Sequence, residues 1–255
     1  MLPTWFLILL PVIAFLYASV GHGGASGYLA LMGLFGVNPS FMRPTALLLN
    51  VFVSVGAFEQ YARRGFMRGH WTLFCWLCAG SIPAAYLGGK LGLPISSYKV
   101  VLGIFLLFPT AWLMGLQRYI QKLEANRAQD TAKKVPYNWA LALIMGLVIG
   151  FLSGLIGIGG GIILSPILIW LQWTTVKETA PISALFIFCN SISGLFGVEK
   201  IIVMPLPEMT LVVGLALGGG LLGAYLGAKH FNQPTLKWLL AIVLLIAAVK
   251  LIFSA

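Results

Sequence analysis

Two clusters of glycine, 136 positions apart, carry the strongest chemical signal in this sequence of 255 residues. The first reads Gly21-His22-Gly23-Gly24 and the second Gly157-Ile158-Gly159-Gly160-Gly161. Adjacent glycines cost about 1 kcal/mol each inside a helix, so each cluster predicts a break between two helices. A helix that restarts after a break offers unpaired N–H groups and a partial positive charge, which favour an anion. We therefore expect anion-binding backbone at Gly21, Gly23, Gly24, Gly157, Gly159, Gly160 and Gly161.

Polar side chains on the helices that follow the two breaks are expected to complete this binding cavity. They are Thr45, Asn50, Ser183 and Asn190, for which hydrogen bonds between helices are an equally good explanation. His22 lies within the first break and has two interpretations, a contact to the anion or its coupling proton, or a hydrogen bond to a freed carbonyl. Arg43 would attract or gate the anion, or else anchor its helix at the membrane surface.

Acidic residues are absent from the middle of every apolar segment of the sequence. This argues against a carboxylate proton relay and against a cation site, and no metal site or cofactor is predicted. The motif Gly24-Ala25-Ser26-Gly27 is also found in rhomboid-type intramembrane proteases, but such chemistry requires a histidine base on a second helix. His22 is on the same short hinge as Ser26, so an enzyme is not expected, although the protease remains an alternative.

The composition places these elements in a lipid bilayer. Hydrophobic residues make up 60% of the chain and charged residues 9%, whereas soluble domains carry about 25% charged residues. The net charge of +10 comes from Lys and Arg that separate apolar runs, as in membrane loops, so a nucleic-acid partner is not expected. The partners predicted are the bilayer and a small anion, and a homodimer is considered as the assembly.

Charge-free windows define the elements that must position the two clusters. Residues 1–42 and 135–176 contain no Asp, Glu, Lys or Arg, and each window is about twice as long as one spanning helix. Each window therefore predicts a helical hairpin broken by glycine. Uninterrupted helices are predicted at about 44–60, 70–89, 98–117, 179–197, 208–228 and 236–253. Close helix packing is predicted at Gly214, Gly218, Gly223 and Gly227.

The two halves of the chain resemble each other. The glycine clusters align at an offset of 136, and residues 85–90 match residues 224–229 in five of six positions. The sequence thus predicts an all-α polytopic membrane protein with two homologous halves, 1–117 and 138–255, joined by a cytoplasmic linker at 118–137. Each half holds one glycine-broken hairpin and three transmembrane helices. If each hairpin enters and leaves on one side of the membrane, the repeats are inverted, which we favour; otherwise they are parallel.

The motifs are similar to those of a known family. The run Gly150-Phe151-Leu152-Ser153-Gly154-Leu155-Ile156-Gly157-Ile158-Gly159-Gly160-Gly161-Ile162-Ile163-Leu164-Ser165-Pro166-Ile167-Leu168 resembles the signature of the sulfite exporter TauE/SafE family. The segments 19–24 and 223–229 also fit, although the first departs from the pattern at His22, Ala25 and Ser26. The resemblance implies proton-coupled transport of a sulfur oxyanion or organosulfonate across the bacterial inner membrane.

The function expected from the residues and the resemblance together is a secondary anion transporter. One half would rock against the other to expose the anion to either side in turn. A passive anion channel is the nearest alternative.

Overall fold

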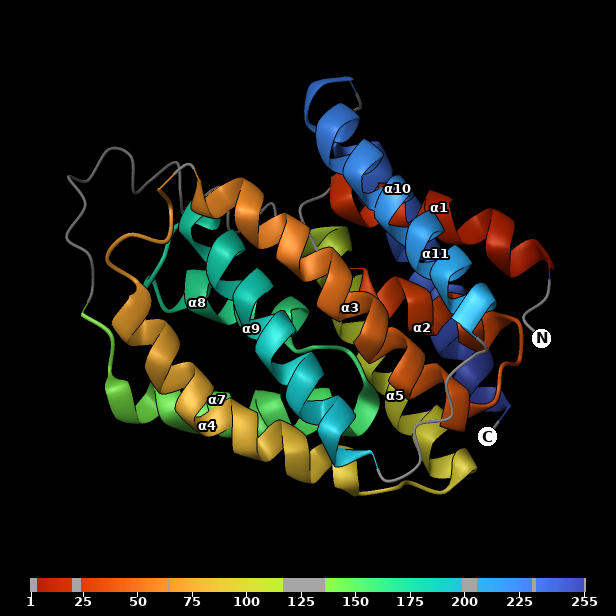
Figure 1. Ribbon diagram of the computed structural model, residues 1–255, viewed down its shortest axis with the longest axis horizontal. Helices are drawn as coiled ribbons and strands as arrows, with labels where there is room; N and C mark the ends of the chain where they lie inside the picture. Colours follow the sequence, from red (N-terminus) through yellow and green to blue (C-terminus); the bar gives the residue numbers. More distant parts are fainter. Residues whose placement is uncertain are drawn as a thin grey trace.

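The computed structural model describes residues 4–19, 24–63, 65–116, 136–198, 206–230 and 233–254, and all regular structure in these ranges is helical (Figure 1). The predicted all-α fold and the division of each charge-free window into two helices are confirmed. Helices also lie at the six positions predicted for uninterrupted ones, but the helix expected at 98–117 is α-helical only to Ala111 and continues as a π-helix. The linker predicted at 118–137 lies almost wholly outside the described residues. The first half contains α1 (Thr4–Ser19), α2 (Ala25–Leu34), α3 (Pro39–Ala62), α4 (Trp71–Lys90), α5 (Ile95–Ala111) and the π-helix η1 (Trp112–Leu116). The second contains α7 (Trp139–Ile156), α8 (Gly161–Trp170), α9 (Val176–Gly197), α10 (Leu206–His230) and α11 (Gln233–Phe253).

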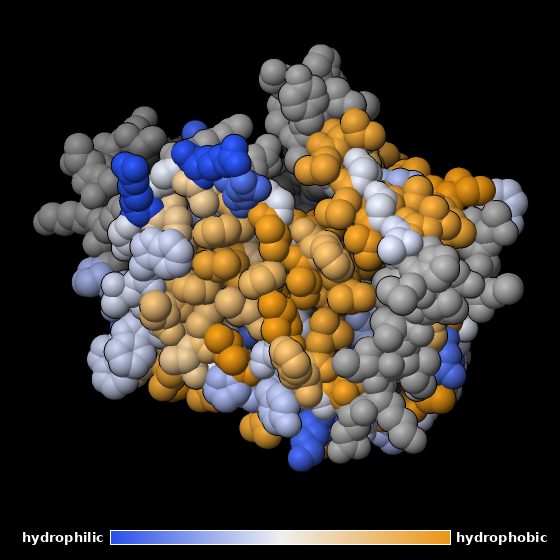
Figure 2. Space-filling view, viewed as in Figure 1, coloured by the Kyte–Doolittle hydropathy of each residue, from blue (hydrophilic) through white to orange (hydrophobic). Residues whose placement is uncertain are grey.

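The outer surface of the bundle is suited to lipid. Within the described chain, α3, α4, α7 and α9 are long and apolar enough to cross a membrane. Large apolar side chains are exposed on the outside of the bundle, among them Trp5, Val148, Phe196 and Ile246. Figure 2 shows one face on which apolar residues cover the middle and hydrophilic residues lie at the edges. The protein is therefore a multi-pass membrane protein.

Polar caps fix the starts of three helices. The side chain of Asn38 accepts a hydrogen bond from the Ser40 N–H at 3.0 Å at the start of α3. Asn138 caps α7 in the same way, and Thr175 and Glu178 form a capping box at the start of α9. A cap satisfies N–H groups that the first turn of a helix leaves unpaired. These helices therefore begin where the sequence supplies an oxygen acceptor.

A seam of glycine joins α4 to α7. A Cβ atom on Gly146 would lie 2.1 Å from the Leu77 carbonyl oxygen, and one on Gly154 would lie 2.0 Å from that of Ala85. Both distances are shorter than any normal contact, so the two backbones touch directly, as small residues permit in membranes. Residue numbers rise together along the two helices, which therefore run parallel.

A second seam joins α1 to α10. A Cβ atom on Gly219 would lie 2.3 Å from the Pro11 carbonyl oxygen, and one on Gly223 would lie 2.2 Å from that of Phe15. The packing predicted at Gly223 is thus present. It is wrong for Gly214 and Gly218, where a Cβ would meet none of the described atoms within 4 Å, and the surroundings of Gly227 lie outside the described side chains.

Both seams connect one half of the chain to the other. In Figure 1, α3 and α9 lie side by side across the middle, with α4 and α7 on one side of them and α1 and α10 on the other. The two central helices run antiparallel, because Leu47 lies against Gly194 whereas Asn50, later in α3, lies near Ser191. Helices α5 and α11 are antiparallel too: the Lys99 ammonium donates to the Ser254 carbonyl, and Gly103 lies against Ala248.

The hairpin α7–α8 begins and ends at the same end of the bundle. The ring of Tyr137, just before α7, lies 6.1 Å from the ring of Trp173, just after α8. Trp139 at the start of α7 packs against Trp76 near the start of α4, with 5.2 Å between ring centroids. The starts of α4 and α9 are joined by His70 and Glu178, whose nitrogen and oxygen are 3.2 Å apart. Helix α8 thus returns the chain to the end from which α7 set out.

Candidate functional site

The second glycine cluster forms the predicted break between α7 and α8. Helix α7 ends where the Gly157 N–H donates to the Ser153 carbonyl at 2.8 Å. The backbone φ angles of Gly157, Gly159 and Gly160 are 93°, 80° and 80°, in the left-handed region that only glycine adopts without strain. Gly161 then begins α8, whose N-terminal cap, Gly160, makes no side-chain hydrogen bond. The first N–H groups of α8 are therefore free of a side-chain cap, as an anion site requires.

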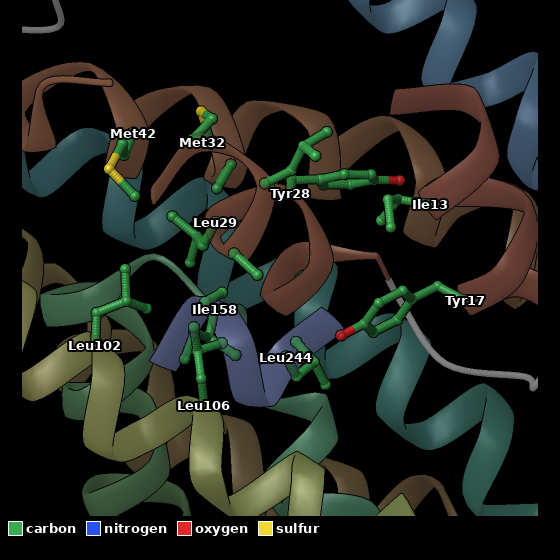
Figure 3. Packing of buried hydrophobic residues seen from close by; sticks show 14 of the residues in the cluster. Ile13, Tyr17, Tyr28, Leu29, Met32, Met42, Leu102, Leu106, Ile158 and Leu244 are labelled. Carbon is green, nitrogen blue, oxygen red and sulfur yellow. The ribbon is translucent and has the colours of Figure 1, made fainter. Parts of the chain in front are cut away.

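The apolar residue inside the break anchors it to the core. Ile158 is buried in an apolar cluster with Leu29, Leu102 and Leu106, which come from α2 and α5 (Figure 3). The glycines on either side of Ile158 can then face other neighbours. The break is thus anchored to the core by one side chain, while its glycines lie against side chains of α3 and α9.

Asn50 and Ser191 are brought together at this break. A Cβ atom on Gly159 would lie 2.8 Å from the Asn50 Nδ2 atom and 3.3 Å from the Ser191 Oγ atom. Asn50 comes from α3 and Ser191 from α9, the two helices that cross at the middle of the bundle. The Ile187 side chain lies at the same place, 2.8 Å from that Cβ position. One carboxamide, one hydroxyl and one apolar side chain therefore pack against the break at Gly159.

Ser153 and Ser183 flank the next two glycines. A Cβ atom on Gly160 would lie 3.5 Å from the Ser153 Cβ atom, and one on Gly161 would lie 3.3 Å from the Ser183 carbonyl oxygen. The Ser183 hydroxyl is 2.8 Å from the hydroxyl of Ser165, so its predicted role as a ligand competes with a hydrogen bond between α8 and α9.

Five polar side chains around the crossing of α3 and α9 are buried without partners. Each is at most 1% exposed, and their polar atoms have no hydrogen-bond partner within the part of the chain that the structure describes; they are Thr45, Asn50, Ser153, Asn190 and Ser191. An unmade hydrogen bond of a buried group costs about 1–3 kcal/mol. Lipid supplies neither donors nor acceptors, so this cluster is what the lining of a water-filled or solute-filled path would require.

Arg43 lies against the start of the break, and the roles predicted for it stay predictions. A Cβ atom on Gly157 would lie 3.2 Å from the Arg43 Cα and Cγ atoms. The guanidinium Nη1 donates to the Leu91 carbonyl oxygen at 3.0 Å, and its Nε atom has no partner among the described residues. Arg43 thus joins α3 to the end of α4 and retains one buried N–H donor, at Nε, that no described residue accepts from.

The first glycine cluster is described only in part. Gly21, His22 and Gly23 lie outside the described residues, so the roles predicted for them stay predictions. Gly24 is the N-cap of α2, and a Cβ on it would lie 2.3 Å from the Tyr28 hydroxyl oxygen. That hydroxyl points toward α1 (Figure 3).

The hydroxyl of Ser26, the nucleophile of the protease alternative, is close to a phenol. Its Oγ atom lies 2.8 Å from the hydroxyl oxygen of Tyr17 on α1. The hydrogen-bond partner of Ser26 is therefore a phenol and not the general base that an intramembrane serine protease needs.

Sequence reasoning missed Ser153 and Ser191 as members of the cluster. Ser153 lies four residues before Gly157 in the same glycine-rich run, and Ser191 directly follows Asn190. Both stood next to residues already singled out. The crossing angle of α3 and α9 determines which face of each helix contacts the break, and this angle cannot be predicted from the sequence.

The full length of the chain can be compared with known proteins. The model of the family described as sulfite exporter TauE/SafE matches residues 6–251. The chain belongs to the TauE/SafE family. This TauE/SafE protein is 35% identical over 245 residues to the probable membrane transporter protein y4hK of Sinorhizobium fredii, with 95% of each chain covered. It is 30% identical over 233 residues to the probable membrane transporter protein YunE of Bacillus subtilis, covering 86% of this chain and 82% of the relative.

No solved structure matches this TauE/SafE chain. The family and the relatives nevertheless make the general activity clear, because they are membrane transporters. The glycine break and its buried polar neighbours are thus the candidate site of a transporter.

Proposed function

We propose that this protein is a secondary transporter that holds a small anion at the start of α8, beside Asn50 and Ser191. One observation carries the proposal: a carboxamide and a hydroxyl, both buried without described partners, face the glycine backbone where a helix restarts inside the bundle. Helix N-termini bind anions through free N–H groups and a partial positive charge. The substrate class that we propose is a sulfur oxyanion or organosulfonate, and the family name, sulfite exporter, supports the first of these.

The charges of the described residues favour an anion over a cation. The carboxylates on the two crossing helices are Glu59, in the last turn of α3, and Glu178, in the first turn of α9. Glu59 pairs with Arg63, four residues later in the chain, and Glu178 lies beside His70. Both are committed at helix ends, whereas a cation site would need carboxylates at the depth of the break.

We further propose that the two halves are inverted repeats. The antiparallel α3–α9 and α5–α11 pairs support this, because an element packed antiparallel against its own counterpart requires an axis perpendicular to the helices. The return of α8 to the end where α7 begins gives the second half an odd number of crossings, and we propose the same for the first. The end that carries Arg63 and Arg68 is assigned to the cytoplasm by the excess of positive charge, in a bacterial inner membrane.

The two seams determine what can move during alternating access. Rocking one half against the other, as the sequence suggested, would separate α1 from α10 and α4 from α7. Backbones in direct contact at Gly154 and Gly223 oppose such sliding. We therefore propose that the moving bodies are the seam pairs, one carrying each hairpin, and that they pivot about the α3–α9 crossing.

Flux into proteoliposomes tests the proposed function. An imposed pH gradient should drive uphill accumulation of sulfite, whereas purely downhill flux of sulfite that ignores the gradient would favour the passive channel. Replacing Asn50→Leu should lower the rate at limiting substrate by about 10–100-fold, the value of a hydrogen bond to a charged group. Asn138→Ser, at the exposed cap of α7, is the control and should transport normally. A folded Asn50→Leu protein with full activity would contradict the placement of the anion site beside Asn50.

A further inference from the structure

The carboxamides at the crossing of α3 and α9 impose a requirement that hydroxyls do not. Asn50 is 1% exposed and Asn190 is fully buried, and in each the Nδ2 and Oδ1 atoms both lack partners among the residues described. A hydroxyl rotates to donate or accept, but a carboxamide presents one NH₂ donor and one carbonyl acceptor whichever way it is turned. A ligand that satisfies these asparagines must therefore accept and donate at once.

A fully ionised oxoanion meets only half of this requirement. Its oxygens accept from the NH₂ groups and from the backbone at Gly159, but it offers nothing to the asparagine carbonyl oxygens and places negative charge near them. A carbonyl left unpaired in a buried site costs about 1–3 kcal/mol. An oxoanion that retains one O–H group donates to such a carbonyl while its other oxygens accept.

The charge of the ligand points in the same direction. The cost of moving an ion from water into a medium of low dielectric rises with the square of its charge, so a dianion is far more expensive to bury than a monoanion. The described positive side chain nearest the break is Arg43, whose Nη1 atom is already bonded to the Leu91 carbonyl. Neutral donors therefore face the anion at Gly159, and they suit one charge better than two.

We propose, resting on the proposed function, that the anion is carried as a singly charged hydrogen oxoanion, with one O–H and at least one ionised oxygen on the same centre. The coupling proton then travels on the substrate itself. No bond within the protein forms or breaks: the hydrogen oxoanion enters from one side and releases its proton to water on the other, according to the pH there. The net result equals the movement of one dianion with one proton.

Of the described titratable or charged groups around the crossing, two lie beside the break: Arg43 against Gly157, and Tyr98, whose hydroxyl donates to the Ile156 carbonyl. No titratable side chain lies on α7, on α8 or on the described side chains of α10, whereas His22 lies outside the described residues and is addressed by the experiment. On α3, α9 and the other helices packed against them, the described titratable or charged side chains are Arg43, Glu59, Tyr61, Lys177, Glu178, Cys189, Cys75, Cys78, Tyr86, Lys90, Tyr98, Lys99 and Tyr28.

Three anions of different protonation separate the outcomes in proteoliposomes loaded with a pH indicator. Sulfite exchanges its last proton near neutral pH, methanesulfonate is singly charged without an O–H group, and sulfate is a dianion. With the leak of protein-free liposomes subtracted, sulfite influx should fall about tenfold per pH unit above that ionisation and should acidify the interior. Methanesulfonate should enter more slowly, without pH dependence or acidification, and sulfate should not enter.

Matched serine variants test the role of the carboxamides. Asn50→Ser exchanges an obligatory acceptor for a hydroxyl, so the ratio of sulfite to methanesulfonate influx should fall about fivefold or more. The same exchange at the exposed cap Asn138 should leave the ratio unchanged. Asn190→Ser provides a second variant if Asn50→Ser fails to fold, and His22→Gln should keep the sulfite pH profile of the native protein.

Three results would overturn the proposal. One is a pH profile for methanesulfonate equal to that for sulfite, since a protein group would then be titrating. Another is sulfate influx as fast as that of sulfite, and the third is an unchanged ratio in folded, active Asn50→Ser. Failure of the native protein to move any of these anions would contradict the proposed function instead.

Discussion

Replacement of Gly159 by alanine isolates the contribution of the break from general strain. The φ angle of 80° costs a non-glycine residue about 1–2 kcal/mol. The added Cβ would lie 2.8 Å from both the Asn50 Nδ2 and the Ile187 Cγ2 atoms, and relieving such overpacking costs about 1–3 kcal/mol more. Gly36→Ala is the matched control, because its φ is 66° and a Cβ there would meet no described atom within 4 Å.

Both variants should lose stability, but only one should lose its ligand. In thermal unfolding of purified protein, Gly36→Ala should report the backbone strain alone, and Gly159→Ala should melt at a lower temperature than this control. The difference of about 1–3 kcal/mol corresponds to roughly 5–150-fold, and the displaced Asn50 should lower anion influx by a factor in that range. Equal melting temperatures and equal influx for the two variants would refute the placement of Asn50 against the break.

Three further changes test the scaffold around the site. Gly154→Ala should prevent folding or strongly lower the melting temperature, because its Cβ would lie 2.0 Å from a carbonyl oxygen of α4. The control Gly214→Ala, on an open helix surface, should be neutral or stabilise the protein by about 0.5–1 kcal/mol. Similar yields of folded protein for the two variants would contradict the close packing of α4 on α7. Tyr98→Phe removes a 2.8 Å hydrogen bond to the Ile156 carbonyl and should destabilise by about 1–3 kcal/mol in chemical unfolding, with anion selectivity unchanged. Thr175→Ala should cost about 1 kcal/mol through loss of the capping box, while Thr175→Ser should retain it.

Much of the fold can be predicted from the sequence because membrane helices are recognisable from local hydropathy. The absence of charge over residues 1–42 and 135–176 predicted the division of each window into two helices. The glycine cluster at 157–161 predicted the position of the second break, since α8 begins at Gly161. Lipid leaves a chain few alternatives to helices, so hydropathy and helix breakers suffice for this level of structure.

The partners of each helix could not be read in the same way. Four-residue spacing of glycine predicted packing at Gly214 and Gly218, but the contacts to α1 are made by Gly219 and Gly223. Small residues permit close approach on any face of a helix, and only the partner decides which face is used. Asn50 was found because it is polar in an apolar helix, whereas Ser191 required knowledge of the crossing. The domain boundaries and the homodimer stay predictions.

The exchange of partners between the halves has a consequence for how the protein is made. Helix α1 is synthesised early, yet Gly219 and Gly223, which receive it, lie about two hundred residues later in the chain. Helix α1 therefore cannot pack against α10 until nearly the whole protein has been inserted into the membrane. Expressed alone, the first 117 residues would present an unfilled partner surface on both α1 and α4. Under the proposed inverted repeats, a single half on its own would bury both surfaces only by pairing with a second copy of itself.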